Sequence, residues 1–161
     1  MSGINITVKL SDQRLTVFHG DSLLDEYSIS TAKNGAGERR DSECTPRGRH
    51  IIRAKIGERA PVGAVFVGRR PTGEICTQDM VRDNPGRDWI LTRILWLSGI
   101  EPGVNRLGDV DTMRRYIYIH GCPDSCSMGE PGSRGCIRMR NQDVIDLFAK
   151  VKAGTRVNII E

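Results

Sequence analysis

Aromatic residues and histidine are scarce in this sequence, and no apolar run is long. The 161 residues include three Phe, three Tyr, two Trp and three His, and no stretch approaches the length of a membrane-spanning helix. Lys and Arg never form a run of five, and the formal net charge is +4. Nucleic-acid surfaces rely on basic patches and stacking aromatics, so neither nucleic acid nor membrane insertion is expected. A small anionic substrate agrees better with the modest positive charge.

An export signal is also missing from the first residues. The stretch "MSGINITVKLSDQRL" has no basic segment, apolar core or small-residue cleavage site. Five cysteines, an odd number, then predict reduced thiols and a cytoplasmic location. If a leader has been removed, the protein would instead work in the periplasm or outside the cell.

The apolar pattern predicts a mainly β protein. Short segments alternate apolar and polar side chains, or are rich in β-branched residues, and Gly, Pro and Asn separate them. The length, with no repeat or linker, indicates one domain that covers residues 1–161. The predicted strands are 4–10, 14–18, 23–30, 49–57, 63–68, 89–99, 114–121 and 155–160.

One helix is predicted near the C terminus. Asn141 is the expected N-cap and Gly154 the expected stop. Helical spacing places five apolar residues on one face: Val144, Ile145, Leu147, Phe148 and Val151.

The segment between this helix and the preceding strand, "HGCPDSCSMGEPGSRGCIRM", concentrates one histidine and three cysteines. A zinc site would use His120, Cys122, Cys126 and Cys136, but the second ligand pair of a usual zinc knuckle is incomplete. A disulfide between Cys122 and Cys126 is sterically feasible and disfavoured in a reducing compartment. Cys44 is predicted to be an ordinary thiol, as is Cys76.

Cys136 has the setting of a nucleophile. Gly132 and Gly135 give the backbone of "GSRGC" the freedom to aim consecutive N–H groups at one point, which an oxyanion requires. A thiol nucleophile also needs a base, and His120 at the end of its strand is the best of the three histidines. His19 and His50 lie within strand segments and are expected at packing or surface positions.

These motifs resemble the catalytic domain of the YkuD-type L,D-transpeptidase family. "IHG" at residues 119–121 is followed by "SRGCIRM", with Cys136 sixteen positions after His120. Upstream, "DSECTPRGRHII" is similar to the family's TP-x-G segment, and the resemblance extends over residues 4–160.

The resemblance implies a β-sandwich or barrel-like domain and no metal or organic cofactor. Its substrate would be a peptidoglycan stem tetrapeptide or a muropeptide. Cys136 would attack the diaminopimelate carbonyl and expel D-Ala, His120 would act as base and then acid, and the Gly121 carbonyl would orient the imidazole. The N–H groups of Arg134, Gly135 and Cys136 would form the oxyanion hole.

The resemblance also implies roles for three other residues of the motif. Ser133 is expected to hydrogen-bond within the loop, and Arg138 to hold a substrate carboxylate or to brace the loop through an ion pair. Arg134 stands where many family members have histidine, and it cannot act as a base. Its expected contribution is a positive field for the thiolate, the oxyanion or the stem carboxylates.

Three functions follow as alternatives. The predicted location favours a cytoplasmic L,D-carboxypeptidase of wall recycling, and an exported L,D-transpeptidase that forms 3–3 cross-links or anchors proteins is the second. A stem-binding module without activity is the third, and intact His120 and Cys136 argue against it. Trp89 and Trp96 are expected either in the core or at the floor of the substrate cleft. The family also implies a carbapenem adduct on Cys136, and the oligomeric state stays open.

Overall fold

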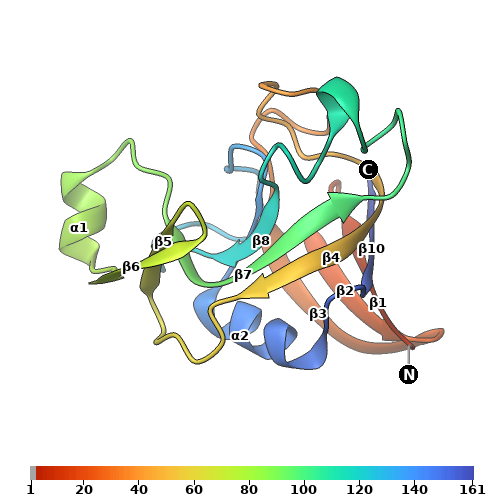
Figure 1. Cartoon of the computed structure of the whole chain (residues 1–161). Helices are drawn as coiled ribbons and strands as arrows, with labels where there is room; N and C mark the ends of the chain where they lie inside the picture. The colour runs from red at the N-terminus through yellow and green to blue at the C-terminus, as the bar shows by residue number, and fades with distance from the viewer. Residues whose placement is uncertain (1–2) are drawn as a thin grey trace.

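The computed structural model describes residues 3–161, which form a strongly curved sheet (Figure 1). The strands are β1 (Ile4–Lys9), β2 (Arg14–His19), β3 (Ser22–Ser30), β4 (Gly48–Ile56), β5 (Ala64–Val67), β6 (Arg70–Ile75), β7 (Ile90–Gly99), β8 (Tyr118–Gly121), β9 (Ile137–Met139) and β10 (Arg156–Ile160). The helices are α1 (Gln78–Asp83), α2 (Asn141–Lys150) and a 3-10 turn at Gly108–Val110. No helix within residues 3–161 is long and apolar enough to cross a membrane.

The sheet closes on itself because β4 pairs with two strands. The order is β4-β10-β1-β2-β3-β9-β8-β7, and β4 also pairs with β7, which completes a ring. β5 and β6 branch outward from β7. The barrel-like, mainly β fold expected from the sequence is therefore confirmed.

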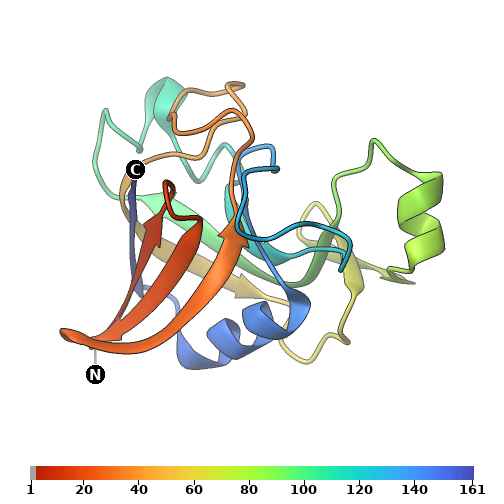
Figure 2. The ribbon, with the colours of Figure 1, turned by 180° about the vertical axis from the view of Figure 1, so that it is seen from behind.

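The ring is filled by the inward side of each alternating strand. Ile6 and Val8 of β1, Leu15 and Val17 of β2, and Ile119 of β8 are at most 1% exposed and belong to one continuous core. The loops 31–47 and 100–116 lie together at the end of the molecule opposite α2 (Figures 1 and 2).

The predicted helix is present, with two corrections at its ends. Arg140 occupies the N-cap position, and Asn141 is the first helical residue, whose side-chain oxygen accepts a hydrogen bond from Thr92 Oγ1 at 2.6 Å. The helix ends at Lys150, and Gly154 lies in the turn before β10. Of the predicted apolar face, Val144, Leu147, Phe148 and Val151 are buried, whereas Ile145 is only half-buried.

The β5–β6 hairpin and α1 project from the ring (Figure 1). The hairpin turn places Gly68 at φ 57° and Arg69 at φ 64°, the pair of positive values that a tight two-residue turn requires. For Arg69 this left-handed conformation is less favourable than it is for glycine. β6 and α1 were not predicted from the sequence, and neither was the short strand β9.

Candidate active site

The candidate site lies on the outer face of β8 and β9. These strands pair in parallel, with His120 opposite Arg138 and Ile119 opposite Ile137. Because side chains alternate along a strand, Ile119 and Ile137 point into the core, and His120 and Arg138 share the other face. Cys136, two residues before Arg138, belongs to that same face, so the register brings the predicted base and nucleophile to one side of the sheet.

His120 is held by the carbonyl of the next residue. Its Nδ1 donates to Gly121 O at 2.6 Å, which places the proton of the neutral ring on Nδ1 and leaves Nε2 with a free lone pair. His120 is fully buried, and within residues 3–161 its Nε2 has no hydrogen-bond partner. Burial lowers the pKa of His120, and the bond to Gly121 offsets only part of this effect.

Gly121 has no room for a side chain. A Cβ at this position would lie 2.4 Å from Asn141 Oδ1 and 2.7 Å from the backbone oxygen of Leu91. The β7–β8 pairing shifts register between Leu91 and Ile94, and the bulge includes Thr92, a β-branched residue at φ 75°. This strained bulge therefore lies against the peptide that orients His120.

The Cys136 thiol is enclosed by the backbone that leads into β8. Its Sγ accepts a hydrogen bond from Tyr118 N at 3.3 Å and contacts Tyr116 O at 3.4 Å. Burial raises the pKa of the Cys136 thiol to about 12, and the cations Arg138 and Arg115 lower it by less. No hydrogen bond joins Cys136 to His120 in the described part of the chain. Burial favours the neutral form of both groups, the thiol and the imidazole.

The loop before Cys136 is fixed by two hydroxyl groups. Ser133 Oγ donates to Cys136 O at 2.5 Å and accepts from Gly135 N at 3.1 Å, which commits the Gly135 N–H to the loop. Thr45, fully buried, donates to Gly135 O at 2.9 Å. In a trans peptide the C=O and N–H point in opposite directions, so Thr45 turns the Cys136 N–H away from itself. Gly135 adopts φ 132°, which a side chain would strain.

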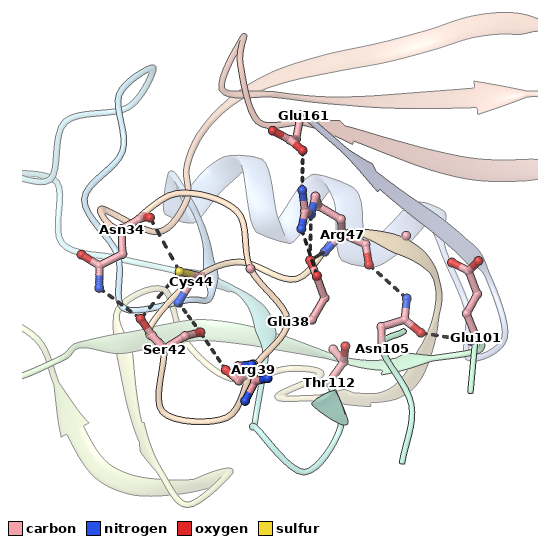
Figure 3. Close-up of polar contacts among 12 residues, drawn as sticks. Asn34, Glu38, Arg39, Ser42, Cys44, Arg47, Glu101, Asn105, Thr112 and Glu161 are labelled. Atoms are coloured by element: carbon pink, nitrogen blue, oxygen red, sulfur yellow. Dashed lines mark hydrogen bonds and ion pairs between the residues drawn. The ribbon is translucent and has the colours of Figure 1, made fainter. Parts of the chain in front are cut away.

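Thr45 belongs to a long loop that is braced by its own polar contacts (Figure 3). Asn34 Nδ2 donates to Ser42 O at 3.1 Å, and the Cys44 Sγ lies 3.6 Å from Asn34 O (Figure 3). At the other end, Arg47 forms an ion pair with Glu38 at 2.8 Å. Arg115 then donates to Cys44 O at 2.7 Å, which fixes the loop beside Gly135.

The arginines of the motif occupy different places. Arg138, a largely buried side chain, pairs with Asp88 at 3.2 Å and donates to Gly132 O at 3.2 Å, so it braces the loop. Arg134 extends outward and donates to Gly86 O at 2.7 Å. The expected positive field at the thiol therefore comes from Arg138 and from Arg115, which sequence reasoning missed; Arg134 does not supply it.

The other cysteines are free thiols. Cys122 is buried, and a hydrogen bond from it lowers the pKa of Cys126, although the two form no disulfide in the structure. Within residues 3–161 no three Cys, His, Asp or Glu side chains gather as metal ligands, so the four residues of the zinc alternative do not come together. His50 is buried and contacts Thr112 Oγ1 at 2.9 Å, whereas His19 is exposed.

One side of Cys136 is covered by an aromatic cluster that the β5–β6 hairpin closes. We call it the aromatic flank: Trp96, Tyr116, Tyr118 and Arg69. Arg69 stacks 4.6 Å from the Trp96 ring and 4.9 Å from the Tyr116 ring, and it donates to Tyr118 Oη at 2.9 Å. The backbone of Tyr116 and Tyr118 contacts Cys136 Sγ directly. Arg69, at the hairpin tip, therefore packs against the two residues that contact the thiol.

The fold and this site define a class: a closed β-sheet domain with histidine and cysteine on one face of two adjacent parallel strands. A profile of the YkuD family, the L,D-transpeptidase catalytic domain, matches residues 4–159, and the chain belongs to this family.

Two curated relatives and one solved structure illustrate the similarity. The chain is 29% identical over 154 residues to a Bacillus licheniformis protein named L,D-transpeptidase YkuD, which covers 96% of this chain and 64% of that protein. Its Bacillus subtilis namesake is 48% identical over 98 residues, 61% of this chain and 49% of that protein. An L,D-transpeptidase structure from Mycobacterium smegmatis superposes with a TM-score of 0.60 at 18% identity, covering 99% of this chain and 59% of that one. The chain thus spans about half to two thirds of these relatives' length.

Proposed function

We propose that this protein is a cysteine-dependent peptidase that cleaves the L,D bond between diaminopimelate and the terminal D-Ala of peptidoglycan stem tetrapeptides. The observation that carries the proposal is the shared face of β8 and β9: the neutral His120 presents a free Nε2 on the side of the sheet that bears Cys136. Family membership supports the substrate class.

The reaction would begin with proton transfer between the two neutral groups. Cys136 Sγ forms a bond with the diaminopimelate carbonyl carbon while its proton moves to His120 Nε2. The C–N bond to D-Ala then breaks, and the amine leaves with that proton. Water attacks the thioester and passes a proton to His120, which returns it to the departing Sγ as the tripeptide is released. Catalytic pairs are often loosely placed without substrate, so the pair would tighten when the stem binds.

Backbone amides would stabilise the tetrahedral intermediate. The Gly135 N–H is bound to Ser133 Oγ, so the Arg134 and Cys136 N–H groups are the better donors for the oxyanion. Thr45 supports this role because it orients the Gly135–Cys136 peptide from the opposite side.

Water is the acceptor that the aromatic flank favours. A transpeptidase must hold a second stem beside the acyl-enzyme, because an amine has to compete with water at about 55 M. Here Arg69 fills the space against Tyr116 and Tyr118, on the side where Sγ contacts the backbone. We therefore propose hydrolysis, the L,D-carboxypeptidase reaction of wall recycling, in the cytoplasm.

The second candidate is an exported transpeptidase that makes 3–3 cross-links, since the named relatives are L,D-transpeptidases. Mass spectrometry of a muramyl tetrapeptide incubated with enzyme, with and without excess glycine, separates the two. Hydrolysis predicts tripeptide and free D-Ala, with only a minority of glycine-exchanged product. Dominant exchange or cross-linked dimers at millimolar acceptor would replace the hydrolase with the transpeptidase. No turnover, with peptide binding intact, would indicate a binding module.

A further inference from the structure

A cavity of about 300 Å³ lies on the other side of the Cys136 loop. It opens between the segment that follows α1 and the segment 123–138, and it includes Gly132 and both motif arginines. We call it the arginine pocket, and its lining residues are Val81, Asn84, Pro85, Arg87, Trp89, Pro123, Cys126, Gly132, Arg134 and Arg138. Its volume is at the lower end of the range for small-ligand sites.

The side chains of this pocket are rich in donors and poor in acceptors. Arg87, Arg134 and Arg138 each carry five N–H donors, and their contacts to Glu74, Gly86 and Asp88 use only part of them. No carboxylate belongs to the lining.

Trp89 adds an independent observation. It is 5% exposed, and within residues 3–161 its indole N–H is buried without a hydrogen-bond partner. A buried unpaired donor is costly in a folded protein, and such exceptions point to a missing partner. The Arg87 guanidinium lies 4.1 Å from the centre of the Trp89 ring, so the two side chains stack on each other at the wall of the pocket.

We infer that the arginine pocket is a carboxylate subsite for the stem peptide. Guanidinium groups bind carboxylates through paired N–H donors, and three of them line this cavity. The inference rests on the proposed function, because it concerns the same substrate. The carboxylate has two possible sources in the stem, the terminal D-Ala and the side-chain end of diaminopimelate, and the chemistry of the pocket is the same for both.

Steady-state kinetics with three peptides test this subsite: the muramyl tetrapeptide, its C-terminal amide, and the peptide amidated on the diaminopimelate side chain. Arg87→Gln and Arg87→Met are the test variants, because Arg87 lines the pocket and adjoins neither His120 nor Cys136. Arg82→Gln is the matched control, since Arg82 is an exposed α1 residue that pairs with Asp79 and does not line the pocket.

Each test variant should raise KM for the free-acid peptide about tenfold, with kcat changed by less than about twofold. One of the two amides should show the same rise with the wild-type enzyme and no further rise with the variants, which identifies the carboxylate. Arg82→Gln should behave as wild type. Unchanged KM across both amides and both variants, with normal turnover, would overturn the subsite.

A binding measurement separates this outcome from a failure of the proposed function. Calorimetric titration of the tetrapeptide into Cys136→Ala, with and without Arg87→Gln, requires no turnover. If the wild type releases no D-Ala but Arg87→Gln still weakens binding about tenfold, the subsite stands and the proposed reaction does not. Equal affinity in both titrations would contradict the subsite whatever the reaction.

Discussion

The aromatic flank and the arginine pocket lie on two sides of the Cys136 loop and contain the same interaction, with different results. On each, an arginine stacks on a tryptophan: Arg69 lies 4.6 Å from the Trp96 ring, and Arg87 lies 4.1 Å from the Trp89 ring. Arg69 also stacks on Tyr116 and is bound to Tyr118, so its flank is filled. Arg87 borders a cavity that already contains two further guanidinium groups.

The difference is set by what surrounds each arginine. The Arg69 guanidinium is satisfied by two aromatic rings and a hydroxyl group, whereas the three arginines of the other flank have two nearby carboxylates, Glu74 and Asp88, and keep unused N–H donors. We therefore expect the filled flank to keep a second stem away and the open flank to attract an anion. This contrast is the basis for the proposed hydrolysis, in which one charged peptide binds and water accepts the acyl group.

The largest effect on activity should come from removing Cys136, which lies between the two flanks. Cys136→Ala should lower D-Ala release by a factor on the order of 10³ or more, because no thioester can form. Imipenem should add its mass to the wild type and not to the variant, and iodoacetamide pre-treatment should prevent the addition. Cys44→Ser is the control, since within residues 3–161 the hydrogen bonds of this thiol go to Asn34 and Ser42 of its own loop. Turnover by Cys136→Ala would refute the nucleophile.

The next effect concerns the loop between the flanks. Thr45→Val removes the bond to Gly135 O and leaves this peptide free to turn, so kcat should fall by about 10²-fold with a smaller change in KM.

Thr112→Val is the matched control for stability. Thr112 is an equally buried hydroxyl residue that binds His50, away from Cys136. Both variants should lose comparable thermal stability, and only Thr45→Val should lose kcat. An equal loss of kcat in the two variants would reduce Thr45 to a structural role.

Thr45 also illustrates what the sequence could and could not predict. The alternation of apolar residues predicted the inner strands, and the HG and SRGC motifs located His120 and Cys136. The hydrogen bond from Thr45 to Gly135 joins positions 90 residues apart, and no local sequence pattern predicts this contact. Arg115 and Arg69 reach the site through similarly distant contacts.

Two of the missed elements, β6 and α1, share a physical reason; the third, β9, has three residues and is too short to show a pattern. Every residue of β6 is exposed, and α1 buries none of its side chains, so neither carries the periodicity on which prediction depends. The raised pKa of the Cys136 thiol is likewise invisible in the sequence, because burial outweighs the effect of Arg138 and Arg115. Burial is a property of the folded chain, and a motif cannot reveal it.

Opening the filled flank should have a smaller effect on product choice. Arg69→Ala removes the stacking on Trp96 and Tyr116 and the bond to Tyr118, which frees space beside the thioester. With excess glycine, the ratio of exchanged to hydrolysed product should rise severalfold. Arg70→Ala, the neighbouring exposed hairpin residue, should leave the ratio unchanged. An unchanged ratio in Arg69→Ala would mean that the hairpin does not control the acceptor.

The smallest effect expected is that of pH on the wild type. The Cys136 pKa is raised to about 12 and the His120 pKa is lowered, both by burial, so the working state is a neutral thiol beside a neutral base. His120 loses this form only when pH falls below its depressed pKa, so the acid limb of kcat/KM should lie below about pH 6.5. Between pH 7 and 9, kcat/KM should change by less than about twofold, because neither group titrates there.

Arg69→Ala should hydrate the Cys136 thiol and lower the pKa of that thiol, so alkylation of Cys136 by iodoacetamide at pH 9 should be faster than in the wild type. Rate–pH profiles of both proteins measure this directly, and a wild-type alkylation rate that levels off near pH 7 would show a pre-formed thiolate and contradict the burial argument.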